Sequence, residues 1–154
     1  MKRITKEFTF SEYLVSELSD SDNVLYRKAL EASRRAYAPY SHFHVGAAAL
    51  LENGEVILGC NQENAAYPSG LCAERVALFS AGAAYPDVPV VALAIIACQD
   101  GRIREQIAPC GACCQVMLET EQRFNRPMRI LLCGAEYVHV IDSVSTLLPF
   151  SFTL

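Results

Sequence analysis

The sequence predicts an α/β sandwich of three layers, in which helices cover both faces of a mixed sheet of about five strands. Two observations carry this prediction. Residues 90–98 form a continuous apolar run of strand length, typical of a strand buried on both faces. Residues 52–54 read Glu-Asn-Gly between two apolar runs, a strong signal for a β-hairpin. Helical patterns alternate with these strands, which places a sheet between helical layers.

The elements are expected in the order α-β-β-α-β-α-β-β. The first helix begins at Ser21 and Asp22, which suit a helix N-terminus, and ends before Pro39. The hairpin strands follow at residues 45–51 and 55–60, and a polar loop rich in turn formers covers residues 61–70. The remaining elements are a helix at 73–83, the strand at 90–98, a helix from Pro109 to about Arg123, and strands at 128–133 and 137–141.

Size and composition limit the classes of function. The 154 residues are most simply one domain, residues 1–154, that buries roughly 70% of its unfolded surface. No stretch approaches the ~18 uninterrupted apolar residues of a membrane span, and the basic N-terminus lacks the apolar run of a secretory signal. We therefore expect a cytoplasmic protein with no membrane partner. The net charge of −4 disfavours nucleic acid, which needs a basic face, and favours a small-molecule substrate.

The seven cysteines favour metal binding or catalysis over a disulfide framework, because the chain is large and has no secretory signal. Three of them lie in two short motifs, Cys-Ala-Glu at 72–74 and Pro-Cys-Gly-Ala-Cys at 109–113. The thiolates of Cys72, Cys110 and Cys113 can fill three corners of a tetrahedral zinc site and leave the fourth for water, as in catalytic sites. Glu74 follows the first thiolate by two residues and is well placed to move protons at that water.

Both cysteine motifs are expected where a helix begins. Helix N-termini carry unpaired N–H groups and a partial positive charge, which favour thiolate over thiol. Arg75 follows Glu74, and its guanidinium could offset more of the thiolate charge by bonding to sulfur. Cys60, Cys98 and Cys133 end or interrupt apolar runs and are interpreted as small buried core residues.

Together, the motifs C-A-E and P-C-x-x-C resemble those of the zinc-dependent cytidine deaminases. Cysteine rather than histidine at the first ligand is similar to the small, homotetrameric nucleoside deaminases. The segment AYAPYSHFHVGAA at 36–48 resembles the family's A-Y-x-P-Y-S-x-F-x-V-G-A-A, and NQENAAY at 61–67 its N-x-E-N-A-x-Y. The resemblance runs from Ala36 to Phe152. It implies a cytidine deaminase-like fold, one Zn²⁺ per subunit and a homotetramer with active sites near the subunit interfaces.

The resemblance also implies roles in nucleoside binding. Asn61 and Glu63 would hold the ribose hydroxyls, and Phe43 would pack on the pyrimidine ring. General chemistry agrees, because residues two apart on an extended segment point to the same side and an aromatic ring suits a flat base. Backbone groups of Ala73 and of the turn at 109–110 are expected to bond to the edge of the base.

The closing segment of the chain and one departure from the family's pattern give two further predictions. The close of the chain, LLPFSF at 147–152, resembles the family's L-L-P-x-x-F, whose last Phe reaches a neighbouring subunit's active site. That role would fall to Phe152, with Phe150 as the alternative. The family usually reads P-C-x-x-C-R-Q, and here Cys114 replaces the arginine. We interpret Cys114 as a packing residue, with a competing metal ligand or an oxidisable thiol as the alternative.

These observations predict the zinc-dependent hydrolysis of cytidine and 2′-deoxycytidine to uridine and 2′-deoxyuridine, with release of ammonia, as in pyrimidine salvage. A blasticidin-type deaminase has the same two zinc motifs and stays open, although residues 67–71 are more similar to the cytidine enzymes. A thiol–disulfide oxidoreductase would use Cys110 and Cys113 but leave Cys72 and Glu74 unexplained. A non-catalytic zinc module would need a fourth protein ligand, for which only Cys114 or Cys133 is plausible.

Overall fold

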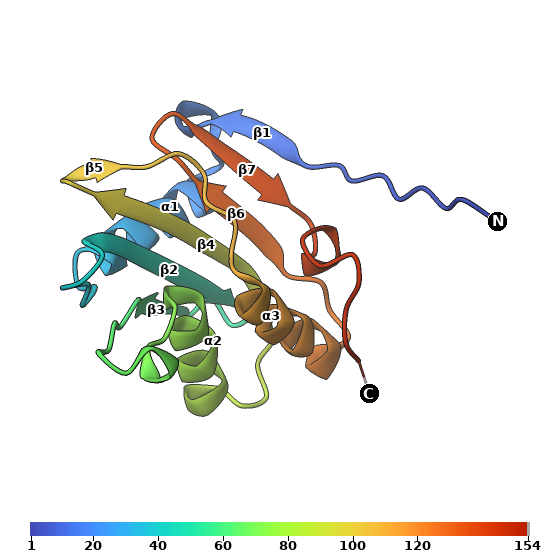
Figure 1. Ribbon diagram of the computed structural model, residues 1–154. Helices are drawn as coiled ribbons and strands as arrows, with labels where there is room; N and C mark the ends of the chain where they lie inside the picture. The colour runs from blue at the N-terminus through green and yellow to red at the C-terminus, as the bar shows by residue number, and fades with distance from the viewer. Residues whose placement is uncertain (154) are drawn as a thin grey trace.

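The computed structural model describes residues 1–153 and has the predicted α/β architecture, a mixed sheet packed between helices (Figure 1). The sheet has the strand order β1-β7-β6-β4-β2-β3, and β5 pairs with β4 beside this path. The central pair β4 and β6 is parallel, and the other pairs are antiparallel. The strands are β1 (Ser11–Leu14), β2 (Phe43–Leu51), β3 (Val56–Cys60), β4 (Val90–Gln99), β5 (Arg102–Ile103), β6 (Arg129–Cys133) and β7 (Tyr137–Ile141).

Within residues 1–153, three α-helices cover the two faces of the sheet. In Figure 1, helix α1 lies behind the sheet, whereas α2 and α3 lie in front of it. Alternation along β2 divides the core in two: Ala47 and Ala49 pack toward α2 and α3, and Ala48 packs toward α1. The helices are α1 (Asp20–Ser33), α2 (Ala73–Ala84) and α3 (Gly111–Phe124), and short 3₁₀ turns occur at η1 (Val15–Glu17), η2 (Tyr67–Ser69) and η3 (Val144–Thr146).

Two glycines let helices lie directly against the sheet. A Cβ at Gly46 would lie 2.0 Å from the carbonyl oxygen of Ala29 in α1. A Cβ at Gly59 would lie 2.3 Å from the carbonyl oxygen of Ala73 in the first turn of α2. Neither position has room for a larger side chain. The contact at Gly59 therefore sets how closely the N-terminus of α2 approaches β3.

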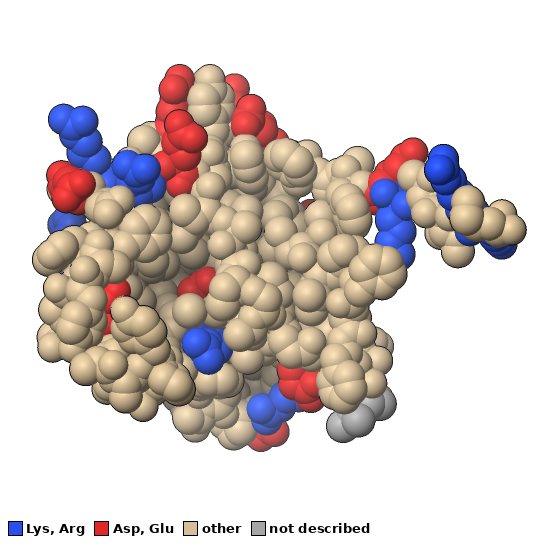
Figure 2. Space-filling model, in the orientation of Figure 1, with Lys and Arg blue, Asp and Glu red and all other residues tan. Residues whose placement is uncertain are grey.

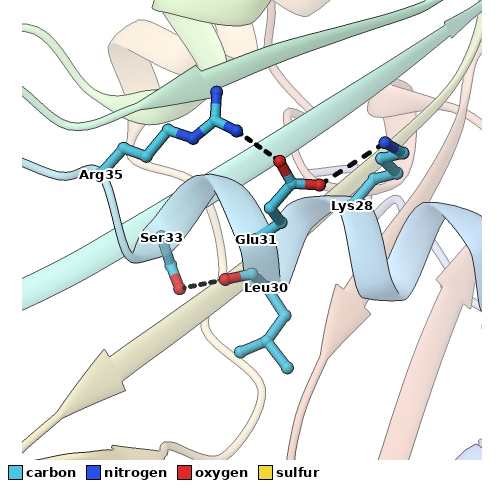
Figure 3. A network of polar contacts seen from close by, with 5 residues as sticks. All are labelled: Lys28, Leu30, Glu31, Ser33 and Arg35. Carbon is cyan, nitrogen blue, oxygen red and sulfur yellow. Dashed lines mark hydrogen bonds and ion pairs between the residues drawn. The ribbon is translucent and has the colours of Figure 1, made fainter.

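Helix α1 turns a charged surface outward. Glu31 forms ion pairs with Arg35 and, at 3.5 Å, with Lys28, while Ser33 donates a hydrogen bond of 2.8 Å to the carbonyl of Leu30 near the helix end (Figure 3). The ion pairs are exposed and contribute little to stability, on the order of 0.5 kcal/mol each. By contrast, the side of the molecule on which α2 and α3 lie is largely uncharged over its middle (Figure 2).

In the described part of the chain the sheet has seven strands, where about five were expected. The two strands missed are β1, which pairs with β7 at one edge, and the two-residue β5. Such short strands show too little alternation to be recognised in a sequence. The first helix also ends earlier than expected, at Ser33. The residues after Ser33 do not continue the helix. Instead Tyr37 pairs with the segment at 61–63: Tyr37 N–H donates to Asn61 O, and Glu63 N–H donates to Tyr37 O.

Lys6, near the N-terminus, contacts the C-terminal segment of the chain. Lys6 donates a hydrogen bond of 2.7 Å to the carbonyl of Pro149, and its ammonium group lies 5.1 Å from the centre of the Phe150 ring. Among residues 1–153, no helix has both the length and the hydropathy needed to cross a bilayer.

Candidate metal centre and active site

Three cysteine sulfurs meet where the N-termini of α2 and α3 converge. Cys72 is the N-cap residue of α2, Cys110 is the N-cap residue of α3, and Cys113 lies in the first turn of α3. The sulfur of Cys110 lies 3.5 Å from that of Cys113 and 4.0 Å from that of Cys72, and all three lie within 4.8 Å of one another. Tetrahedral zinc with bonds of 2.3 Å requires sulfur–sulfur distances of about 3.8 Å. The cluster therefore fits zinc.

The surroundings of the cluster favour negative charge on sulfur. The N–H groups of two helix N-termini face it, and a nitrogen of the Arg75 guanidinium lies 3.7 Å from the sulfur of Cys72. The pKa of Cys72 is lowered to about 5, first by a hydrogen bond from the Cys113 thiol and then by Arg75. The same hydrogen bond raises the pKa of Cys113, which keeps its proton. A divalent cation would displace such protons, so metal binding here depends on pH.

Glu74 is a buried carboxyl beside the cluster. Only 4% of its surface is exposed, and it lies in the first turn of α2. Burial raises its pKa above the ordinary value, and the nearby Cys72 thiolate raises it further, against the lowering effects of a hydrogen bond with Cys113 and the charge of Arg75. A carboxyl with a raised pKa can both accept and return a proton near neutral pH, as general acid–base catalysis requires.

A cavity of about 720 Å³ opens in front of these groups. This volume suits a small organic molecule. Most of the residues predicted for the site line it: Phe43, Asn61, Glu63, Cys72, Ala73, Glu74, Arg75 and Cys110. Sequence reasoning gave no role to several further lining residues, among them Tyr40, Tyr67, Leu71 and Ile107. The first three lie in or beside the motifs already quoted, whereas nothing in the sequence distinguishes Ile107 from a core residue.

Asn61 and Glu63 are both bonded to the segment that carries Phe43. The Asn61 amide accepts a hydrogen bond of 2.7 Å from Val45 N–H and donates one of 2.9 Å to the Phe43 carbonyl. The Glu63 carboxylate accepts hydrogen bonds from the Ser41 hydroxyl and from the backbone N–H groups of Tyr40 and Ser41, which lower its pKa. The carbonyl oxygen of Asn61 keeps a second lone pair, and its NH₂ group keeps a second N–H. The Glu63 carboxylate also keeps a free lone pair, so both side chains can still bind a ligand.

The remaining predicted positions lie outside the cavity. Phe152 is 70% exposed and Phe150 is 87% exposed, and neither lines the cavity of its own chain. The carbonyl of Phe152 accepts a hydrogen bond of 2.9 Å from Gln115. Cys114 is buried, does not belong to the three-sulfur cluster, and its thiol lies 3.6 Å from the carbonyl of Pro109. This geometry favours the packing interpretation of Cys114 over that of a competing ligand.

Fold and site together define a class of protein: an α/β sandwich with a three-cysteine metal site built on two helix N-termini, and a buried carboxyl at the base of a cavity. Comparison with known proteins gives the family. Residues 19–125 match the model of the cytidine and deoxycytidylate deaminase zinc-binding region. This chain therefore belongs to that family, whose members are hydrolases.

Individual relatives named cytidine deaminase are similar to this chain in sequence and in structure. The cytidine deaminase of Halalkalibacterium halodurans is 47% identical over 141 residues, which cover 84% of this chain and 92% of that protein. The cytidine deaminase of Mycobacterium tuberculosis is 42% identical over 113 residues, or 70% of this chain and 79% of that protein. The crystal structure of cytidine deaminase from Burkholderia pseudomallei superposes with a TM-score of 0.74 at 40% identity, over 88% of this chain and all of that one.

Proposed function

We propose that this protein hydrolyses cytidine and 2′-deoxycytidine to uridine and 2′-deoxyuridine, with release of ammonia, in pyrimidine salvage. One observation carries the proposal: the buried Glu74 lies beside a zinc-compatible cysteine cluster in a cavity also lined by Phe43, Asn61 and Glu63. The relatives named above, all cytidine deaminases, support this substrate. We further propose a cytoplasmic location, with neither nucleic acid nor a membrane as partner.

In this proposal Cys72, Cys110 and Cys113 hold one Zn²⁺ per subunit. The bound ion supplies Lewis-acid activation of the attacking water. Arg75 offsets thiolate charge through its contact with Cys72. This contact matters because three thiolates place more negative charge around a divalent ion than its own charge neutralises.

Glu74 moves the protons of the reaction. It accepts a proton from the attacking water and delivers it to ring N3, which makes C4 electrophilic. After the water oxygen bonds to C4, Glu74 accepts the second proton of that oxygen and gives it to the amino group, so that the C4–N bond breaks and ammonia leaves. The raised pKa of Glu74 suits both directions of transfer.

The rest of the cavity orients the nucleoside. Phe43 packs on the pyrimidine ring, and Asn61 and Glu63 bind ribose hydroxyls through the hydrogen-bonding capacity that their contacts leave over. Backbone groups of Ala73 and of the turn at 109–110 bond to the edge of the base. In a homotetramer, Phe152 of a neighbouring copy closes the cavity.

The decisive experiment follows the absorbance of cytidine after addition of zinc-loaded protein, with Glu74→Gln as the matched control. We expect wild type to consume cytidine and Glu74→Gln, with its zinc retained, to be slower by about 10²–10⁴-fold. Near wild-type turnover by a zinc-bound Glu74→Gln protein would refute the proton-transfer role. A folded, zinc-bound wild type that leaves cytidine unchanged would refute the substrate, and blasticidin would be tested next.

A further inference from the structure

We infer that Ser41 is a positioning residue that locks Glu63 and Phe43 together, so that one hydroxyl group sets the geometry of both the sugar and the base subsites. The inference rests on the proposed function, because that function assigns Glu63 to the sugar and Phe43 to the base. It goes beyond that function by giving a role to a residue that touches neither the metal cluster nor the proton carrier.

The Ser41 hydroxyl lies between the two groups that it connects. It donates a hydrogen bond to Oε1 of Glu63 and accepts one of 3.0 Å from the backbone N–H of Phe43. The other carboxylate oxygen, Oε2, accepts hydrogen bonds of 3.3 Å from Ser41 N–H and 2.9 Å from Tyr40 N–H. Both oxygens of Glu63 are therefore held by one turn, and Oε1 is held by the Ser41 side chain.

This arrangement depends on an unusual backbone at the residue between Ser41 and Phe43. His42 has a φ of 54°, in the left-handed region that non-glycine residues seldom adopt. Its N–H donates a hydrogen bond of 3.1 Å to the carbonyl of Ala38, which closes the turn. The turn brings the Ser41 hydroxyl back to the N–H of Phe43, and β2 begins at that residue.

Phe43 is consequently fixed from both sides by residues of the sugar subsite. Its N–H is bonded to Ser41, which is bonded to Glu63, and its carbonyl accepts the hydrogen bond from Asn61. A carboxylate offers about four lone-pair sites, of which three are used here, so Glu63 can still accept a hydrogen bond from a sugar hydroxyl. Loss of the Ser41 hydroxyl would leave Oε1 unrestrained and the Phe43 N–H without its partner.

The kinetic consequence follows from where these groups act. Sugar and base contacts of this kind bind the ground state and the transition state alike, so their loss raises KM and leaves kcat nearly unchanged. We expect Ser41→Ala to raise the KM for cytidine about tenfold with kcat within about twofold, and Ser41→Thr, which retains the hydroxyl, to restore most of the loss. Ser80→Ala, at an exposed position of α2, is the matched control and should behave as wild type.

Two further measurements separate positioning from a merely structural role. With 2′,3′-dideoxycytidine, which has no ribose hydroxyls in the subsite of Glu63, Ser41→Ala should raise KM clearly less than with cytidine, because only the placement of Phe43 against the base is then disturbed. In a double-mutant cycle with Glu63→Gln, the effect of Ser41→Ala on the KM for cytidine should shrink in the same way. Equal KM increases for both nucleosides, or additive effects in the cycle, would overturn the inference.

A readout without substrate keeps this inference distinguishable from the proposed function. The amide proton of Phe43 should exchange with solvent at least tenfold faster in Ser41→Ala than in wild type, and Ser41→Thr should restore slow exchange. An inactive wild type would contradict the proposed function but leave this measurement possible. Unchanged exchange at Phe43 in Ser41→Ala would overturn the inference whatever the activity on cytidine.

Discussion

At the scale of single residues, this site depends on how neighbouring groups divide protons and charge. Cys72 gains thiolate character from Arg75 and Cys113, while burial keeps Glu74 protonated to a higher pH than usual. Negative charge is thus favoured on the Cys72 sulfur of the cluster, whereas the Glu74 carboxyl tends to hold a proton. Arg75 has a further feature: its Nε is buried and has no hydrogen-bond partner among the described residues, so only its terminal nitrogens serve the cluster.

We predict that Arg75→Gln weakens zinc binding by about 10–100-fold, the range seen when a group that supports metal ligands is removed. The reason is that the Cys72 thiolate loses its guanidinium partner. Competition with a chromogenic chelator would measure the affinity. Arg102→Gln, at an exposed position of β5, is the matched control. Equal zinc affinities for the two variants would contradict this role of Arg75.

A second prediction at this scale concerns alkaline stability. Burial raises the pKa of Cys133 from 9.0 to about 12, so the folded state keeps a proton that the unfolded state loses. The stabilisation is fully present below pH 9 and is lost as the pH rises toward 12, at about 1.4 kcal/mol per pH unit for this one group. Urea titrations between pH 8 and 11 should give a shallower decline of the unfolding free energy for Cys133→Ala than for wild type. Parallel declines would show that Cys133 does not retain its proton.

At the scale of elements, the site is built by two helix N-termini that the sheet holds in place. The N-terminus of α2 rests on Gly59 of β3. Helix α3 is tied to the C-terminal part of the chain by Glu121, whose carboxylate accepts hydrogen bonds from Met128 N–H, the Ser143 hydroxyl and Val144 N–H. Each anchor joins a helix that carries a cysteine of the cluster to segments distant from that cluster, so the position of the three sulfurs depends on packing well outside the cavity.

We predict that Gly59→Ala both destabilises the fold, by about 1–3 kcal/mol, and weakens zinc binding. Its methyl group would lie 2.3 Å from the Ala73 carbonyl, so α2 must move away from β3 and carry Cys72 with it. Gly82→Ala, in helix α2 itself, is the matched control, because a Cβ there would lie no closer than 3.8 Å to any atom outside that helix. Urea unfolding and chelator competition test the two effects, and a Gly59→Ala protein with wild-type zinc affinity would refute the link.

The sequence predicts helices and long strands well, because apolar patterns of ten residues or so identify them, as in β4 and α2. It does not predict β1, since Ser11–Leu14 becomes a strand only by pairing with β7. For the site, the two cysteine motifs are enough to predict that Cys72, Cys110 and Cys113 lie together, and their sulfurs do lie within 4.8 Å of one another. The hydrogen bonds of Ser41 could not be predicted, because they require the left-handed conformation of His42 and a segment about twenty residues further along the chain.

At the scale of the whole molecule, one sheet runs through the structure and its two cores share the same strands. We therefore propose that residues 1–154 form a single cooperative domain. Many large apolar side chains nevertheless remain exposed on the isolated chain, among them Phe79, Tyr67, Phe150 and Phe152. Exposed apolar side chains mark protein–protein contacts where they form a contiguous patch. The largely uncharged side of the molecule in Figure 2 agrees with burial in an assembly.

The last prediction tests that assembly and the two candidate phenylalanines together. If Phe152 enters the cavity of a neighbouring copy, Phe152→Ala should raise the KM for cytidine about tenfold or more, because a neighbour's ring no longer covers the bound nucleoside. Phe150→Ala is the matched control: its ring packs near Lys6 of its own chain, so its loss should change KM less than twofold.

Light scattering should give four chains per particle for wild type and both variants, and activity per chain should fall on dilution as the particle dissociates. A monomeric wild type with full activity would refute the homotetramer, and a larger KM effect at Phe150 than at Phe152 would reverse their assigned roles.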